Sequence, residues 1–124
     1  MKIIEALKFL ELYLKLRDQS LPLKTSYKLS KLARRLETEQ NFYQDKLRKI
    51  LSQYAEKDEK GEIKFNERGD IVFIPETIRE CEKEITELQN FKIEDIEITF
   101  TLDELEALQI TPLELNCLFP LITE

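Results

Sequence analysis

Carboxylates at helical spacing are the residues of this chain whose types and spacing best suit chemistry. Glu80 with Glu84, and Asp103 with Glu106, stand three or four residues apart, so each pair would meet on one helix face. Such a pair can hold a divalent cation or act as acid and base. Because any acidic helix surface produces this spacing by chance, we interpret both pairs as solvated faces.

Nucleophilic, metal and nucleotide chemistry find little support in the composition. The chain has no histidine, which is the usual base near neutral pH and the usual activator of serine or cysteine nucleophiles. Cys81 and Cys117 are too few for a disulfide framework, and we expect reduced, buried thiols. Gly61 and Gly69 match no phosphate-binding loop. We therefore predict a protein that is not an enzyme, with no catalytic, cofactor-binding or metal-binding residues.

A stripe of basic residues is the candidate binding site. Its members are Lys24, Lys28, Lys31, Arg34 and Arg35. A stripe of this kind can contact a phosphate backbone, but the whole chain has a net charge of −6 and Tyr27 is the only aromatic residue placed to stack among the cations. It can also be a solvated face that balances acidic residues elsewhere. An acidic protein partner explains the stripe more economically than nucleic acid, so we predict that these five residues bind a partner protein.

The charges are unevenly distributed along the sequence. Residues 24–49 hold eight basic residues against three acidic ones, whereas residues 75–124 hold three against thirteen. We therefore expect a basic side and an acidic side. The length of 124 residues and the 42% of hydrophobic residues predict a single domain over residues 1–124.

Helical periodicity marks three segments of the sequence. Residues 3–17 carry a broad apolar stripe, and the charged residues within it exclude a membrane span. Residues 23–54 have apolar side chains three, four or seven residues apart, which predicts a protruding or paired helix of roughly 45 Å. A third helix begins after Pro75 and is expected to pack antiparallel on the second. The residues expected to match are Leu36, Tyr43, Leu47 and Ile50 with Ile78, Cys81, Ile85 and Leu88.

Short strands and capped helices are expected elsewhere. Apolar segments around Gly69 predict a β-hairpin over residues 62–74. Alternation over residues 91–100 predicts one late strand, re-aimed by a bulge or turn near Asp95. Two threonines, Thr101 and Thr111, each precede a glutamate by three residues and should cap two short helices, the second ending at Pro120. We see no internal repeat.

These elements together predict an α+β fold that is predominantly helical. Its expected parts are a long antiparallel helical hairpin with an inserted β-hairpin, a late strand and two short C-terminal helices. The apolar residues from Leu105 to Ile122 either cap the core or dock into a partner or a second copy. The sequence leaves these two roles open.

Several segments together resemble a known family. They are Leu21-Pro-Leu-Lys24, Ser26-Tyr-Lys-Leu-Ser-Lys-Leu32, Glu56-Lys-Asp-Glu-Lys-Gly61, and Ile110-Thr-Pro-Leu-Glu-Leu115 with the later Pro120. In this order they resemble a family of small uncharacterised proteins of bacteriophages and prophages of Gram-positive and gut bacteria. The resemblance covers nearly the whole chain, and no single motif in it is diagnostic or catalytic.

The resemblance implies a phage-encoded accessory protein in the host bacterial cytoplasm or in the virion. It brings no enzymatic residues to carry over. We expect a non-catalytic protein that acts by protein–protein interaction and inhibits a host factor such as a defence protein. The alternative is a structural or assembly component of the virion, which would form a homo-oligomer.

Overall fold

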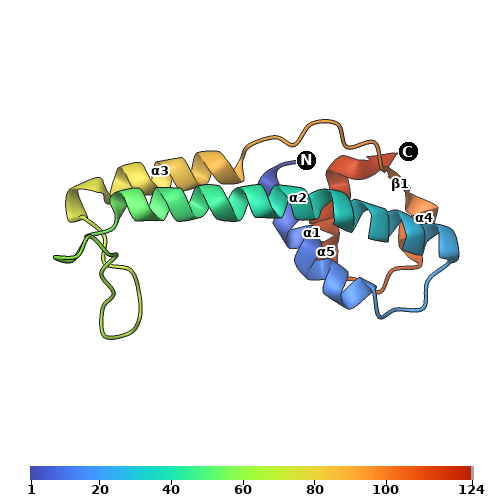
Figure 1. Cartoon of the computed structure of the whole chain (residues 1–124). Helices are drawn as coiled ribbons and strands as arrows, with labels where there is room; N and C mark the ends of the chain where they lie inside the picture. Colours follow the sequence, from blue (N-terminus) through green and yellow to red (C-terminus); the bar gives the residue numbers. More distant parts are fainter. Residues whose placement is uncertain (124) are drawn as a thin grey trace. The chain divides into compact units, whose positions relative to one another are not determined.

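The computed structural model describes residues 1–123 and is mostly helical, with 62% of its residues in helices and a small parallel sheet of two strands (Figure 1). This confirms the predominantly helical α+β class. The chain consists of two compact units. The first comprises Met1–Asn41 and Phe91–Glu124, and the second comprises Phe42–Asn90. The single domain over residues 1–124 stays a prediction.

Helix α1 (Ile3–Leu16) supplies one side of the core of the first unit. Its buried residues recur at steps of three and four, as the sequence indicated, and they are Ile3, Ala6, Phe9, Leu12 and Leu16. The helix begins where the Glu5 carboxylate accepts a hydrogen bond from the backbone N–H of Lys2 at 2.8 Å. Among the described residues, no helix is both long enough and apolar enough to cross a bilayer.

Helix α2 (Leu23–Tyr54) is 32 residues long, which confirms the predicted bounds. Its first half belongs to the first unit and buries a stripe that contains Leu29, Leu32 and Leu36. In its second half Tyr43, Leu47 and Ile50 are only half-buried. Leu36 is fully buried within the first unit. The antiparallel pairing of α2 with α3 stays a prediction.

The second unit contains three chain segments joined by a ring of hydrogen bonds. The N–H of Glu56 donates to the carbonyl of Val72 (2.8 Å), that of Val72 donates to Lys64 (3.0 Å), and that of Lys64 donates back to Glu56 (2.9 Å). Isolated antiparallel bridges accompany the ring, for example Phe65 with Ile71. Regular strands are not formed within residues 62–74. The three segments are thus joined in a ring and not as a two-stranded ladder.

Two turns close this ring in the same way. The side chains of Asp58 and Asn66 each accept hydrogen bonds from the backbone N–H groups two and four residues later. The glycine at the fourth position of each turn, Gly61 or Gly69, has a φ of 80° or 82°. The turns are eight residues apart and share a pattern, Asp-Glu-Lys-Gly-Glu-Ile and Asn-Glu-Arg-Gly-Asp-Ile. The expectation of no internal repeat was therefore wrong.

Helix α3 (Ile78–Gln89) follows a single 3-10 turn, η1 (Pro75–Thr77), so Pro75 begins the helical region as expected. The thiol of Cys81 is buried, whereas Ile85 and Leu88 are half-buried. A helix with one buried residue on its apolar face packs against a thin layer of neighbours.

The C-terminal residues complete the first unit. Strand β1 (Phe100–Thr101) pairs in parallel with β2 (Ile122–Thr123), and Phe100 lies opposite Ile122. Between the strands lie α4 (Leu102–Glu106), α5 (Pro112–Leu115) and the 3-10 helix η2 (Asn116–Leu121). Both predicted capping boxes are present, which confirms the two short helices.

The end of the C-terminal helical region differs from the expectation. The chain does not stop at Pro120 but continues as a 3-10 helix to Leu121. The buried residues of the C-terminal segment, from α4 to η2, cover the core. They are Leu105, Leu108, Cys117, Leu118 and Leu121. Leu113 and Phe119 remain exposed. The segment therefore caps the core, which is the first of the two roles that the sequence left open.

Candidate functional site

The basic stripe that the sequence singled out lies on the first half of α2, but its members do not share one role. Lys28 is bound within the first unit. Its Nζ lies 2.8 Å from Oε1 of Glu104 and donates to the carbonyl of Thr99 at 2.9 Å. It also lies 5.7 Å from the ring centroid of Phe100. Lys28 therefore stabilises the fold, because three groups of the same unit surround its charge.

The same contacts affect Glu104. The hydrogen bond from Lys28 and the backbone N–H of Thr101 lower the pKa of this carboxyl below its ordinary value. The side chain of Glu104 is only 13% exposed, and its second oxygen is buried without a hydrogen bond among the described residues. A carboxylate in this position is held as the charged partner of Lys28.

Arg35 is also used inside the first unit. Its Nη1 lies 2.7 Å from Oε1 of Glu39, one helical turn further on, and its Nη2 donates to the carbonyl of Glu94 at 3.2 Å. Two of the five predicted binding residues thus hold parts of the chain together. Their spacing on the helix could not reveal the distant contacts, because Glu94 is 59 residues from Arg35 and Glu104 is 76 residues from Lys28 in the sequence.

The remaining basic residues of the stripe are free to meet a partner. Lys24, Lys31 and Arg34 are exposed, and within residues 1–123 none of them forms an ion pair. Two large hydrophobic residues lie among them. Leu23 is 86% exposed and Tyr27 is 65% exposed.

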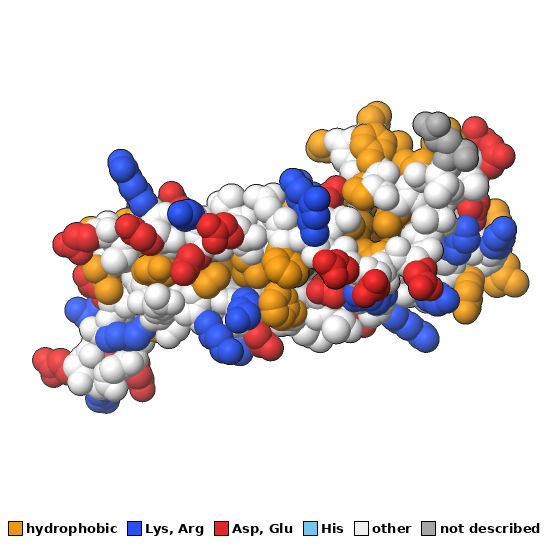
Figure 2. Space-filling model, turned by 90° about the horizontal axis from the view of Figure 1, so that it is seen from above, with side chains coloured by type: hydrophobic (Ala, Val, Ile, Leu, Met, Phe, Trp, Pro, Cys, Tyr) orange, Lys and Arg blue, Asp and Glu red, His pale blue; other side chains and the backbone are white. Residues whose placement is uncertain are grey.

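We call this surface the α2 outer face and define it as Leu23, Lys24, Tyr27, Lys31 and Arg34. Starting at Leu23, steps of four, four and three residues lead to Tyr27, Lys31 and Arg34, which places them along one side of the helix. The buried stripe of Leu29, Leu32 and Leu36 lies on the opposite side. Figure 2 shows basic and hydrophobic side chains next to one another at the end of the first unit where α2 begins.

Sequence reasoning missed Leu23 as part of this site. The available signal was the 3.6-residue period, because Leu23 and Tyr27 fall on the side opposite the apolar stripe of their own helix. When a leucine and a tyrosine lie on the polar side of an amphipathic helix, no other residue of that helix covers them. Tyrosine and arginine are the residue types most enriched at the centres of protein interfaces.

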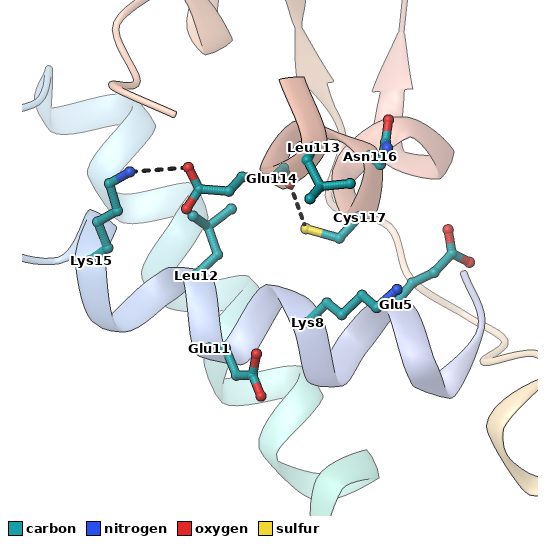
Figure 3. Close-up of a pocket in the computed structure, with 9 residues that line it drawn as sticks. All are labelled: Glu5, Lys8, Glu11, Leu12, Lys15, Leu113, Glu114, Asn116 and Cys117. Atoms are coloured by element: carbon teal, nitrogen blue, oxygen red, sulfur yellow. Dashed lines mark hydrogen bonds and ion pairs between the residues drawn. The ribbon is translucent and has the colours of Figure 1, made fainter. Parts of the chain in front are cut away.

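A groove of about 530 Å³ lies elsewhere in the first unit, between α1 and the α5–η2 segment (Figure 3). Lys15 bridges it through an ion pair of 3.0 Å with Glu114. The backbone N–H of Thr111 and the ammonium of Lys15 lower the pKa of Glu114. The charged side chains lining the groove have both signs, and they are Glu5, Lys8, Glu11, Lys15 and Glu114. Three carboxylates and two ammonium groups nearly cancel, so the groove has only a weak electrostatic preference for a charged ligand.

The thiols are buried and free, as expected. Burial raises the pKa of Cys117 to about 11, and its Sγ donates to the carbonyl of Glu114 at 3.2 Å. Burial also raises the pKa of Cys81. A thiol with a raised pKa is a poor nucleophile, because only the thiolate reacts.

The acidic pairs noted in the sequence do not come together as a site. Within the described residues, no group of three or more acidic or thiol side chains is placed to hold a metal ion. In the second unit Glu84 instead lies beside Tyr54, whose pKa is raised by burial and by this carboxylate. This contact joins the end of α2 to α3.

Comparisons with known proteins leave the family of this chain open. No protein-family model, curated protein or solved structure matches it. The resemblance to small phage and prophage proteins stays a prediction, and the geometry of the α2 outer face carries the functional argument.

Proposed function

We propose that this protein is a non-catalytic, phage-encoded accessory protein that binds an acidic protein surface through its α2 outer face. The observation that carries the proposal is the combination of Leu23 and Tyr27, both largely exposed, with the unpaired cations of Lys24, Lys31 and Arg34. The apolar pair supplies area to bury, and the cations supply selectivity for carboxylates. Binding of this kind would inhibit a host protein, such as a defence protein, by covering its working surface.

The geometry favours a protein partner over nucleic acid. A phosphate backbone needs a row of cations, and the row of Lys24, Lys28, Lys31 and Arg35 is broken because Lys28 and Arg35 are bound to Glu104 and Glu39. Leu23, the most exposed large hydrophobic residue of the face, has no role in contacting phosphate. A protein surface with carboxylates around an apolar depression would satisfy both kinds of side chain.

The second unit would present a helical hairpin in this proposal. Support comes from the contact of Tyr54 with Glu84, from the antiparallel bridge of Ala55 with Phe73, and from the course of α3 in Figure 1. The segments around the ring of hydrogen bonds would act as the inserted β-hairpin. The pairing of α2 with α3 would involve the second half of α2 alone.

The second candidate function is a structural or assembly component of the virion. It is favoured by Leu113 and Phe119, which are exposed by 80% and 55% on the otherwise buried C-terminal segment. Apolar side chains of this size suit contacts between repeated copies. A stable ring or higher oligomer in sedimentation would support this candidate, whereas a monomer or dimer would support the accessory protein.

The test of the proposed function is affinity capture from host bacterial extract, with the captured proteins identified by mass spectrometry. The parent chain is compared with Lys31→Glu/Arg34→Glu, which reverses two charges of the α2 outer face. The matched control is Lys49→Glu/Lys83→Glu, which makes the same change in net charge at two exposed residues of the second unit. We expect a protein that the parent and the control capture and the α2 variant loses. A capture profile shared by all three proteins would refute the proposal.

A further inference from the structure

In the segment Glu94–Thr99 the residues after Asp95 alternate between half-buried and exposed as in a strand, but no neighbouring strand pairs with them among the described residues. The segment lies in the first unit, and within residues 1–123 no backbone N–H group in it has a hydrogen-bond acceptor. Its two terminal carbonyls, those of Glu94 and Thr99, accept from the side chains of Arg35 and Lys28. The N–H groups between them are left for another molecule or for water.

The chain on both sides of this segment is already paired. Before it, the N–H of Ile3 donates to the carbonyl of Phe91 (3.0 Å), and the N–H of Ile93 donates to Met1 (2.8 Å). After it, β1 pairs with β2. With both ends bonded and two side chains of α2 holding the terminal carbonyls, the segment loses little further freedom when a partner binds.

The side chains of the segment alternate as those of an edge strand do. Ile96 and Ile98 are half-buried, whereas Glu97 and Thr99 are exposed. Before the segment, the buried residue is Ile93, and after Asp95 the half-buried residues are Ile96 and Ile98, so the alternation of buried and exposed residues changes phase between them. Asp95, which has a left-handed φ of 61°, lies at this change. The strand predicted over residues 91–100 is therefore not formed over residues 91–99, and only its last residue, Phe100, lies in β1. The alternation of burial and the break near Asp95 agree with the expectation.

The charge of the segment indicates what would pair with it. The carboxylates of Glu94, Asp95 and Glu97 are exposed, and none of them forms an ion pair within residues 1–123. Opposite charges facing one another across two strands are stabilising, and like charges are destabilising. A strand added here would place basic residues opposite Glu97 and apolar residues over Ile96 and Ile98.

We propose that Glu94–Thr99 is a docking edge for an extended segment of a partner protein in which basic and apolar residues alternate. The partner would add its backbone to the free N–H and C=O groups of the edge, as in other cases of strand addition. This site does not depend on the α2 outer face, which is basic and would select an acidic surface. A result that refutes binding at one of these sites therefore does not refute binding at the other.

The test is an NMR titration of the full chain with a short synthetic peptide that alternates lysine with valine. We expect shifts at the amides of residues 94–99 and slower hydrogen exchange at alternate amides among them, because only every second N–H group faces the added strand. A peptide of the same composition with lysines and valines in separate blocks should bind at least about fivefold more weakly. Glu97→Lys should weaken binding of the alternating peptide by about fivefold, the range for reversing one cross-strand charge pair.

The remaining outcomes decide against the proposal. Shifts elsewhere on the chain, equal binding of the two peptides, or unchanged binding by Glu97→Lys would overturn it. Concentration-dependent shifts of residues 94–99 without any peptide would mean that a second copy occupies the edge, which also overturns it. Glu97→Gln serves as a second variant if Glu97→Lys does not fold, and it should weaken binding by a smaller factor than the reversal.

Discussion

The two glycines of the second unit illustrate how single residues fix its turns. Gly61 and Gly69 both have φ values near 80°, and a Cβ at either position would meet no atom within 4 Å. The cost of replacing them is therefore one of backbone conformation alone. We expect Gly61→Ala and Gly69→Ala each to lower the free energy of unfolding by about 1 kcal/mol.

Urea denaturation of the two glycine variants measures this cost. Gly61→Asn and Gly69→Asn are the controls, because asparagine adopts positive φ more readily than alanine and should restore part of the loss. A marked difference between the two alanine variants would contradict the equivalence of the turns.

The ion pair of Lys28 with Glu104 should be visible in the pH dependence of stability. The pKa of Glu104 is lowered in the folded protein, mainly by Lys28, from its ordinary value of 4.5. The pair therefore stabilises the fold at pH values above the ordinary pKa of 4.5, and its contribution is lost as the pH falls through the lower pKa of the folded state. Glu104→Gln should remove this part of the acid sensitivity and reduce stability at neutral pH by about 1 to 2 kcal/mol.

The pH dependence is measured by urea denaturation between neutral pH and the acid range. Glu106→Gln is the matched control, since Glu106 lies on the same helix and is exposed. Equal pH profiles of Glu104→Gln and the parent would contradict the role given to Lys28.

The buried thiols should resist alkylation in the folded protein. Burial raises the pKa of Cys117 to about 11 and raises that of Cys81, so few thiolates exist at neutral pH and access is restricted. We expect iodoacetamide to label neither residue in the native state and both in urea, as read by mass spectrometry. Rapid native labelling of Cys117 would show that the C-terminal segment does not cover it stably.

At the scale of elements, the two halves of α2 differ in how much they contribute to stability. Leu36 is fully buried in the first unit, whereas Leu47 is half-buried in the second. We expect Leu36→Ala to cost about 2 to 5 kcal/mol and Leu47→Ala to cost about 1 to 2 kcal/mol. Thermal or urea unfolding of the two variants tests the order, and a larger loss for Leu47→Ala would contradict it.

Elements with local signals were predictable, and elements that depend on distant partners were not. The bounds of α2 follow from Pro22 and from a regular apolar period, and the two capping boxes follow from Thr101 and Thr111. The inserted β-hairpin is not confirmed, because the chain forms a ring of three hydrogen bonds through Glu56, Lys64 and Val72, which cannot be inferred from alternation. The repeated turn pattern was present in the sequence and could have indicated it.

The candidate site likewise has features that local spacing predicts and features that depend on distant partners. Helical spacing indicated that the basic residues of the stripe lie near one another on α2. It could not indicate that Glu104 and the carbonyl of Glu94 would engage Lys28 and Arg35, because those contacts exist only after the chain folds back. The part of the stripe that remains exposed, three of its five residues, is therefore smaller and more apolar than the sequence suggested.

At the scale of the whole molecule, the account assigns opposite charges to two separate binding surfaces. The α2 outer face is basic and would meet an acidic protein, whereas the Glu94–Thr99 edge is acidic and would accept a basic strand. Both surfaces lie in the first unit. A protein with two such surfaces could hold one partner by two contacts or bring two partners together.

The measurement that tests the central claim most directly is the affinity of the captured partner for Lys31→Glu/Arg34→Glu, by calorimetry over a range of salt concentrations. We predict a loss of at least about tenfold relative to the parent, with weaker salt dependence and an unchanged free energy of unfolding. The control Lys49→Glu/Lys83→Glu should bind like the parent, and duplex DNA should not compete. Parental affinity in the α2 variant, or displacement of the partner by DNA of any sequence, would contradict the claim that the α2 outer face is a protein-binding site.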